Sequence, residues 1–396
     1  MTDLERILVL WRELEAAGAD YVLATVVEVE GSSYRKPGAC MLLAPDGRRV
    51  GTVSGGCLEA QVAQRAWWLT VDGPIIQRYS TLEDDGDLPY GSGCGGVIYL
   101  LLERRTTAAP LLHVLEQAFT RRIPIAVANI LEGSRLGRRA FAGLTLPNPG
   151  ERAPSFSSSP EKLANSEPIS PDPELQELAN SAFNQGSSME RRISIQGTNL
   201  RAWANFRAAR PGLWIFGAGD DAQPILRLAR EMGWYVTVAD GRSHLTTRER
   251  FPAADGLHVL SPTAQPADQA GNSPPALANL RPHDAAVLMT HSFEQDSHIL
   301  ALLLTLDFQL AYIGVLGPQR RTLELLAEAA RLLNLPASAA QTERWLDQLH
   351  TPMGLDLGAE SPETIALSVI AEVQKSLTAA TALPLRQVRA HAVTRA

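Results

Sequence analysis

Apolar residues in the first part of the chain recur at two spacings, one typical of helices and the other of strands. Thr2 and Glu5 stand at capping-box spacing, and the apolar stripe that follows them predicts a helix. Another helix is predicted to begin near Leu58. Short apolar runs predict strands over residues 21–29, 40–43, 97–102, 123–130 and 140–146. These elements predict an N-terminal domain of α/β or α+β type over residues 1–146.

Beyond residue 211 the predicted strands and helices alternate. Strands are predicted over residues 213–216, 234–239, 285–290 and 309–315, with helices in the connections. Because parallel strands need long crossover connections, this alternation predicts a doubly wound parallel sheet. The fold class is therefore α/β, with a Rossmann-like domain over residues 211–380 and a C-terminal tail over residues 381–396.

The segment between the two domains has a different composition. Ser, Pro, Asn and Glu dominate from Pro147 to about Gly186, and aromatic residues are few. Such a sequence buries too little apolar surface to offset its ordering entropy. We expect a flexible insertion over residues 147–190, with room for a short helix around residues 174–182, and a connector over residues 191–210.

Composition excludes several classes of protein. The chain has 396 residues, of which 45% are hydrophobic and 20% charged, and its net charge is −7. This charge argues against a general electrostatic grip on nucleic acid. Apolar runs are too short for stable membrane insertion. Three cysteines are too few for a disulfide framework, and the acidic start does not resemble a secretory signal. We expect a cytoplasmic protein with free thiols.

The clearest single motif is a glycine loop after a predicted strand. Gly217-Ala-Gly219-Asp-Asp-Ala222 fits the pattern G-x-G-x-x-[GA], opens a helix, and is followed by Asp240 at the end of the next strand. Gly217 allows a tight turn, and Gly219 allows close approach of a phosphate to the backbone at the helix N-terminus. Asp240 is a candidate acceptor for ribose hydroxyls. Asp220 and Asp221 argue against phosphate binding, because they add negative charge beside the proposed phosphate position. The alternative is that they cap the helix.

Two cysteines stand in other glycine-rich loops. Cys57 follows Gly55 and Gly56 just before a predicted helix, and Cys94 lies within Gly-Cys-Gly-Gly. A thiolate is favoured near a helix N-terminus, which raises its nucleophilicity. The alternative is that both are small buried residues beside turns. No zinc-ligand spacing is present, so no metal site is predicted. Cys40, on a predicted strand, is most simply a core residue.

Other candidates are weaker signals for anion binding. Arg35 and Lys36 lie in the first glycine loop, and the alternative for them is a solvated loop. His291 and Asp296 follow a strand, where ligands of doubly wound sheets bind, although a lone His there equally often braces a loop. Arg320 and Arg321 follow another strand. The predicted cofactor-binding residues are therefore Arg35, Gly55, Gly56, Gly217, Gly219, Asp240, His291 and Arg320.

Read in order, the motifs resemble the xanthine dehydrogenase accessory factor family (XdhC/CoxI). The resembling stretches span nearly the whole chain outside the Ser/Pro-rich segment. The chain departs from the family pattern in two respects: Asp220 stands where many members carry His, and the Ser/Pro-rich insertion is not part of the pattern. The stretches are Gly31-Ser-Ser-Tyr-Arg-Lys-Pro-Gly38, Ser54-Gly-Gly-Cys-Leu-Glu59, Gly93-Cys-Gly-Gly96, Phe216-Gly-Ala-Gly-Asp-Asp-Ala-Gln-Pro224, Val238-Ala-Asp-Gly-Arg242, Met289-Thr-His291, Ala311-Tyr-Ile-Gly-Val-Leu-Gly317 and Gly354-Leu-Asp-Leu-Gly-Ala359.

The resemblance implies an N-terminal accessory domain and a role in maturing molybdenum hydroxylases. Family members bind the molybdenum cofactor, as molybdopterin or its dinucleotide form, and promote exchange of an oxo for a sulfido ligand. The implied partners are a cysteine desulfurase and an apo molybdenum hydroxylase, and we expect a homodimer. On this reading Cys57 and Cys94 lie near the molybdenum or the incoming sulfur. The chain is then a carrier more than a catalyst.

Two alternatives remain. The glycine loop also suits an NAD(P)-dependent oxidoreductase, although no Tyr-x-x-x-Lys proton relay is evident. A non-catalytic interaction scaffold with degenerate sites is the other. Binding of a pterin, of a dinucleotide or of neither distinguishes the three.

Overall fold

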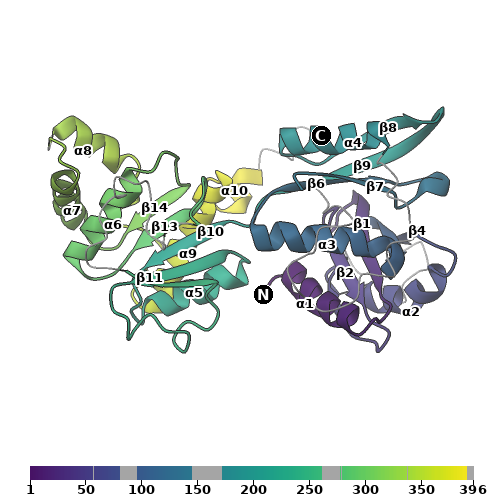
Figure 1. Cartoon of the computed structure of the whole chain (residues 1–396), viewed down its shortest axis with the longest axis horizontal. Coiled ribbons are helices and arrows are strands. Elements are labelled where there is room, and N and C mark those ends of the chain that lie inside the picture. The colour runs from purple at the N-terminus through teal and green to yellow at the C-terminus, as the bar shows by residue number, and fades with distance from the viewer. Residues whose placement is uncertain are drawn as a thin grey trace, which may run out of the picture. The chain divides into compact units, whose positions relative to one another are not determined.

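The chain folds into two compact units, Met1–Arg210 and Pro211–Ala396. The structure is a computed structural model, and it describes residues 1–56, 58–80, 96–144, 172–260, 277, 279–336 and 338–389. Cys57, Cys94 and most of the expected insertion therefore lie outside the described residues. Figure 1 labels most of the helices and strands of the two units.

The first unit contains a five-stranded antiparallel sheet, sheet A. Alternating residues along its strands point to opposite faces, and both faces are covered by helices. Tyr21, Leu23 and Leu42 pack against α1 (Asp3–Ala16) and α3 (Arg105–Arg121), whereas the other face packs against α2 (Glu59–Leu69). The strand order is β3-β2-β1-β5-β4, with β1 (Val22–Gly31), β2 (Cys40–Leu43), β3 (Arg49–Gly51), β4 (Ile75–Ser80) and β5 (Gly96–Arg104).

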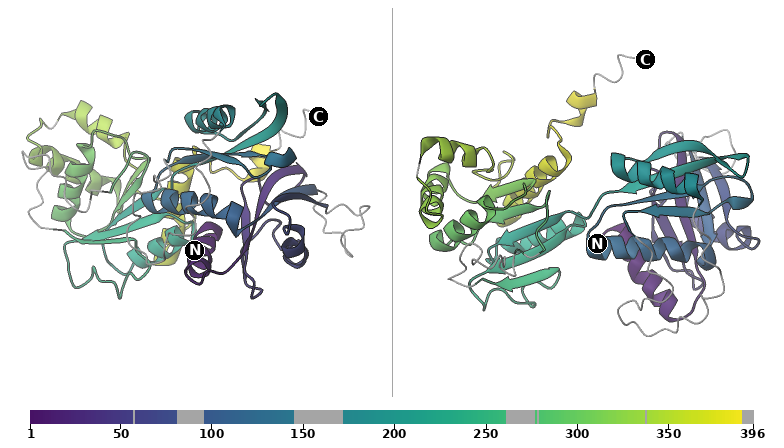
Figure 2. Two further views of the ribbon diagram at one scale, coloured as in Figure 1. Left: turned by 45° about the vertical axis from the view of Figure 1, so that its right-hand side comes forward. Right: turned by 45° about the horizontal axis from the view of Figure 1, so that its top comes forward.

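A second antiparallel sheet, sheet B, completes this unit. Its order is β7-β6-β9-β8, and α4 (Pro173–Gln185) covers one face, as Figure 2 shows. Helix α3 packs against both sheets, because Ile125 and Val127 of sheet B belong to the same core cluster as the α3 leucines. The strands are β6 (Ile125–Ile130), β7 (Arg139–Ala142), β8 (Met189–Ile195) and β9 (Thr198–Arg207), with a short 3-10 helix, η2 (Gly133–Arg135), after β6.

Sheet B corrects the expected boundaries. The connector predicted over residues 191–210 is wrong, because β8 and β9 form edge and central strands of this sheet. The expected insertion also ends too late, since α4 lies within it; the short helix expected around residues 174–182 is confirmed. Leu175, Leu178, Ala179 and Ala182 of α4 are buried against the sheet. A few apolar residues at helical spacing were enough to anchor this polar segment.

The second unit is built on a parallel five-stranded sheet, which confirms the predicted Rossmann-like fold. The strands are β10 (Gly212–Phe216), β11 (Tyr235–Asp240), β12 (Gly256–Val259), β13 (Ala285–Leu288) and β14 (Tyr312–Val315), in the order β12-β11-β10-β13-β14. The chain winds outward from β10 in one direction and then from β13 in the other. The edge between β10 and β13 is thus the switch point of the sheet.

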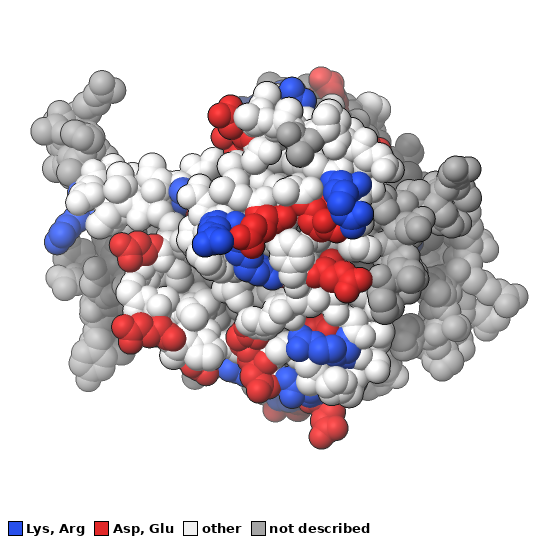
Figure 3. Space-filling view, turned by 90° about the vertical axis from the view of Figure 1, so that its left-hand side faces the viewer, with Lys and Arg blue, Asp and Glu red and all other residues white. Residues whose placement is uncertain are grey.

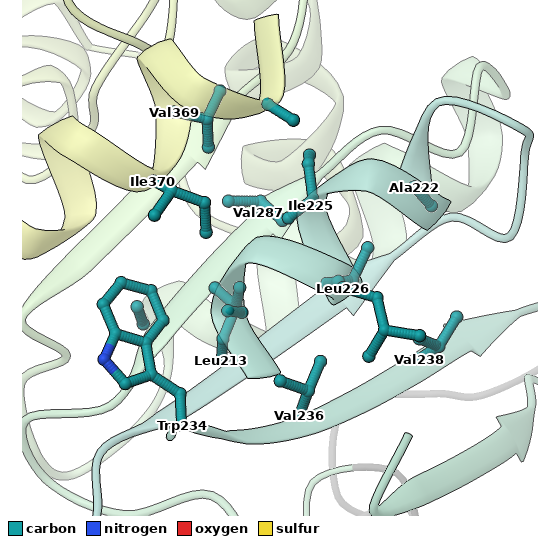
Figure 4. Packing of buried hydrophobic residues seen from close by; sticks show 14 of the residues in the cluster. Leu213, Ala222, Ile225, Leu226, Trp234, Val236, Val238, Val287, Val369 and Ile370 are labelled. Atoms are coloured by element: carbon teal, nitrogen blue, oxygen red, sulfur yellow. The ribbon is translucent and has the colours of Figure 1, made fainter. Parts of the chain in front are cut away.

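Helices cover both faces of this sheet. Leu213, Val236 and Val287 pack against α5 (Ala222–Glu231) and α9 (Pro362–Thr378), as Figure 4 shows. The alternate residues Trp214 and Leu288 face α6 (Phe293–Leu304), α7 (Gln319–Leu332) and α8 (Ala339–Leu346). A short helix, α10 (Leu385–Arg389), follows α9. Both faces of the central strands are apolar, as a parallel sheet between two helical layers requires.

None of the helices in the described ranges is both long enough and apolar enough to cross a membrane.

Candidate functional site

The glycine loop after β10 lies at the switch point of the parallel sheet. Gly217 has φ +136°, and a Cβ atom there would lie 2.4 Å from the carbonyl oxygen of Met289, which follows β13. Only glycine allows the two strand ends to approach this closely. The Gly217 N–H donates to the carbonyl of Ala239 at 2.8 Å, which ties the loop to β11 as well. The loop is therefore fixed by both neighbouring strands, and α5 begins directly after it with its positive dipole end.

Asp240 braces this loop and is not available at the surface. Its side chain is 0% exposed, and Oδ2 accepts the Ala218 N–H at 2.7 Å. Arg242 donates to both carboxylate oxygens, from Nε at 3.0 Å and from Nη2 at 2.7 Å. Burial alone would raise the pKa of Asp240, but the hydrogen bonds from Arg242 and Ala218 outweigh it and lower the pKa. This geometry favours a role in shaping the loop over contact with a ribose.

The two acidic residues of the loop are each paired with a basic side chain. Asp220 forms an ion pair with Arg250 at 2.7 Å, and Asp221 Oδ2 lies 2.9 Å from His291 Nε2. Neither carboxylate caps α5, since no side-chain hydrogen bond is made at its N-cap; the capping alternative is therefore wrong. The Arg250 guanidinium reduces the repulsion that Asp220 would exert on an anion. The contact between Asp221 and His291 shows that His291 and the glycine loop meet at one edge of the sheet.

Of the two arginines after β14, only Arg321 takes part in the strand-end network. Its guanidinium lies 2.6 Å from Asp296 Oδ2, whose side chain is 1% exposed, and Asp296 Oδ1 accepts the Thr290 hydroxyl at 2.7 Å. Arg320, by contrast, is 90% exposed and pairs with Glu324 one turn along α7. The placement of Arg320 in the cofactor-binding set is not supported by this geometry. Two adjacent positions on a helix point about 100° apart, and the sequence alone did not select between them.

Sequence reasoning missed Arg242, Arg250 and Gln295. Gln295 accepts the Gly241 N–H at 3.2 Å, and a Cβ atom on Gly241 would crowd its amide at 2.8 Å. Arg242 carries a usable signal, because it stands two residues after the strand-end aspartate. Arg250 and Gln295 carry none, since the fold brings them to the loop from distant positions.

A second site-like loop lies in the first unit, between β3 and α2. The Glu59 carboxylate accepts the N–H groups of Val53, Ser54, Gly55 and Gly56 at 2.9–3.2 Å and the Ser54 hydroxyl at 2.8 Å. Burial opposes ionisation of Glu59, but these bonds outweigh it and lower its pKa to about 2. The loop thus has the form of an anion-binding nest, and a side chain of the chain itself is the anion.

The predicted residues of the first unit are placed as follows. Gly55 and Gly56 adopt φ +104° and +123° and direct their N–H groups to Glu59, so these two donors are already used. Arg35 forms an ion pair with Asp3 at 2.8 Å. Cys57 and Cys94 lie outside the described residues. Gly56 and Leu58 on either side of Cys57 are both held, the latter by a bond from its N–H to Ser54 Oγ at 3.0 Å.

The charge on one face of the second unit is mixed. On the face shown in Figure 3, acidic and basic side chains lie side by side. The surface seen there offers no extended basic region of the kind that a polyanion would use.

A glycine loop at the switch point of a doubly wound sheet defines the second unit as a Rossmann-type domain, joined to an N-terminal α+β domain. Residues 213–373 match the model of the XdhC Rossmann domain, and residues 14–80 match that of the XdhC and CoxI family. The chain belongs to the XdhC and CoxI family.

Relatives match along most of the chain. A Bacillus subtilis protein described as a probable xanthine dehydrogenase subunit is 32% identical over 89% of this chain and 92% of its own length. The molybdenum cofactor insertion chaperone PaoD of Escherichia coli is 26% identical over 90% of this chain and 83% of its own. A crystal structure of a xanthine dehydrogenase from Bacillus halodurans is 27% identical, with a TM-score of 0.64 and 96% of each chain covered.

Proposed function

We propose that this chain is a molybdenum cofactor-binding accessory factor that assists cofactor sulfuration and insertion into a xanthine dehydrogenase-type molybdenum hydroxylase. The observation that carries the proposal is the similarity to an insertion chaperone over 90% of this chain. The cofactor is cargo in this scheme and is passed on, so the protein needs a site that binds it reversibly. We place the activity in the cytoplasm, with a cysteine desulfurase and the apo-hydroxylase as partners.

The switch-point edge of the parallel sheet is the proposed cargo site. The molybdenum cofactor is a pterin with a phosphate, and its dinucleotide form carries a pyrophosphate; both are anions. The N-terminus of α5 offers its positive dipole end beside Gly219, and Arg242 and His291 are partly exposed at the same edge. Because Arg250 offsets the charge of Asp220, the edge is compatible with a phosphate. Gly219 keeps the approach to the helix free of a side chain.

The thiols of Cys57 and Cys94 are the proposed contacts to molybdenum or incoming sulfur. Soft thiolate sulfur suits both partners, and a hydroxyl in its place is hard and stays protonated at neutral pH. The Glu59 nest supports this role for Cys57, since it fixes the backbone on both sides of that residue. Because Glu59 already accepts the N–H groups of the nest, we expect Cys57, and not these N–H groups, to contact the cofactor.

The proposed cargo site is tested by loading. The full chain is purified from a host that makes molybdenum cofactor, and bound molybdopterin is oxidised and identified by mass spectrometry. Gly219→Val should carry at least about tenfold less pterin, which corresponds to about 1.4 kcal/mol. A Cβ at this position meets Asp221 Oδ1 at 2.5 Å, so Asp221→Ala, which removes that side chain from its place, is the matched control. Equal loading of wild type and Gly219→Val removes the loop from the site.

The maturation role is tested in cells. Strains with Cys57→Ser or Cys94→Ser should accumulate folded client hydroxylase that lacks the sulfido ligand, and chemical resulfuration should restore part of its activity. Client abundance, measured in parallel, separates this result from a folding defect. Full client activity in both variants makes the thiols structural. Full client activity in a strain without the protein, or wild-type protein that carries no pterin, overturns the proposed function.

A further inference from the structure

A small cavity lies within the first unit, and Gly38 at the end of the first glycine-rich loop is part of its wall. Its wall comes from β1, β2 and β5 of sheet A, from β6, β7 and β9 of sheet B, and from α3. Its volume is about 20 Å³, which is enough for about one particle of the size of a water molecule. Part of the wall is apolar, including the buried Trp203. The polar part consists of Thr25, Cys40, Asn129, Arg139, Asn205 and Arg207.

Among the residues that the structure describes, the wall carries two arginines and no carboxylate. Arg139 is paired with the fully buried Glu103 and donates from Nη1 to the Thr107 carbonyl at 2.7 Å. Its buried Nε–H has no hydrogen-bond partner in the described ranges. Burial dominates at Glu103 and raises the pKa of that carboxyl group, despite the neighbouring arginine. Glu103 itself does not line the cavity. Arg139 thus has a buried N–H donor without a hydrogen bond, which lowers the stability of the folded state.

The partners of Arg207 within the described ranges are all neutral. Its guanidinium donates to the Asn205 side-chain oxygen at 3.2 Å and to the Gly38 carbonyl, and it lies 3.8 Å from Cys40 Sγ. No carboxylate in the described part of the chain lies within ion-pair distance of it. A half-buried cation without a counter-ion is unfavourable, and the low dielectric of the apolar wall strengthens its attraction for an anion.

The backbone is shaped to hold this arginine. Gly38 has φ +95°, and a Cβ atom there would lie 2.8 Å from Asn205 Oδ1, the atom that accepts from Arg207. The Asn205 amide nitrogen donates in turn to Ser188 at 3.2 Å, which fixes its orientation. Glycine at position 38 therefore allows the Asn205–Arg207 pair to close over the cavity. Thr25 contributes a hydroxyl group 3.6 Å from the Cys40 thiol on the same wall.

We propose that this cavity binds one small monovalent anion of the size of chloride, held by Arg207 and the free Nε–H of Arg139. One negative charge would offset the unpaired charge of Arg207. A volume of about 20 Å³ favours a monatomic anion over a larger tetrahedral oxyanion, so size adds to charge in the expected selectivity. This anion would link sheet A to sheet B, and its binding does not depend on the proposed cargo site.

Hydrogen exchange of the full chain tests the proposal at constant ionic strength, with chloride replacing gluconate. An anion that binds only the folded state slows exchange in proportion to its occupancy. Peptides that cover residues 22–43 and 198–207 should exchange more slowly in chloride, by at least about tenfold at saturation. Sulfate should give less protection than chloride, because it is larger than the single particle that this volume holds.

Two variants and a control complete the design. Arg207→Gln removes the charge, and Val127→Ile fills the cavity while leaving both arginines in place; each should abolish the chloride effect. Arg191→Gln, at an exposed position on the neighbouring strand β8, should keep it. Each variant is taken as folded if its exchange rates in gluconate equal those of the wild type. The proposal is overturned if chloride gives no protection, if sulfate protects equally, or if both Arg207→Gln and Val127→Ile respond like the wild type.

Discussion

Replacing Glu59 by Gln should release the loop that precedes α2. Gln is nearly isosteric, but it has one acceptor oxygen, and its NH₂ group would face backbone N–H groups that now donate to a carboxylate oxygen. Five donors converge on Glu59, four from the backbone and one from Ser54. Charge-assisted bonds of this kind are stronger than neutral ones, and the donors left without a partner add to the loss.

The magnitude follows from the pKa of Glu59. A carboxyl group whose pKa falls from its ordinary value of 4.5 to about 2 on folding contributes about 3 kcal/mol to the stability of the folded state. Because the folded pKa is the lower one, this contribution is complete above about pH 4.5 and is lost as the pH falls towards 2. The Glu59→Gln variant should lose it at every pH. It should therefore differ from the wild type at pH 7 and approach it near pH 2.

Peptide-resolved hydrogen exchange is the appropriate assay, because the two units need not unfold together. The amides of residues 53–56 are the donors themselves, and in the variant they should exchange about two orders of magnitude faster at pH 7. Glu177→Gln, at an exposed position on α4 of the same unit, is the matched control and should change exchange there by less than about threefold. Unchanged exchange of residues 53–56 in Glu59→Gln would refute the reasoning.

Three further predictions concern the other contacts. Arg321→Gln leaves Asp296 buried without its cation and should lower the unfolding free energy of the second unit by about 3 kcal/mol in denaturant titrations. The control Arg320→Gln, one residue away, should change this free energy by less than about 0.5 kcal/mol. Equal effects of the two variants would contradict the role given to Arg321. Asp240→Asn should speed hydrogen exchange of the loop after β10, since the Ala218 N–H and Arg242 lose a charged acceptor; protection equal to that of wild type would contradict the bracing role. Limited proteolysis should cut first within residues 147–171, as their composition predicts. The fragment that begins near α4 should stay bound to the N-terminal fragment, because β9 pairs with β6. Separation of the two fragments on size exclusion would count against this association.

The sequence was sufficient for the elements whose cause is local. Alternating strands and helices beyond residue 211 predicted the parallel sheet, because a hydrophobic run bounded by turn residues has few ways to be buried. The glycine loop and Asp240 were also found from spacing. The resemblance of ordered motifs indicated the family, which the comparisons confirmed.

The tertiary structure alone decided what these residues do. Asp240, a candidate acceptor for ribose hydroxyls, accepts from Ala218 and Arg242 in the folded chain. Gly55 and Gly56 direct their N–H groups to Glu59. Such pairings join positions whose side-chain directions depend on the whole fold. The strands β8 and β9 are a second example. Their polar residues resemble those of a linker in the sequence, and only the pairing with each other and with β6 in sheet B makes them strands. The sequence determines which hydrogen-bond donors and acceptors a chain contains. Which donor pairs with which acceptor is determined by the packing of segments that are far apart in the chain.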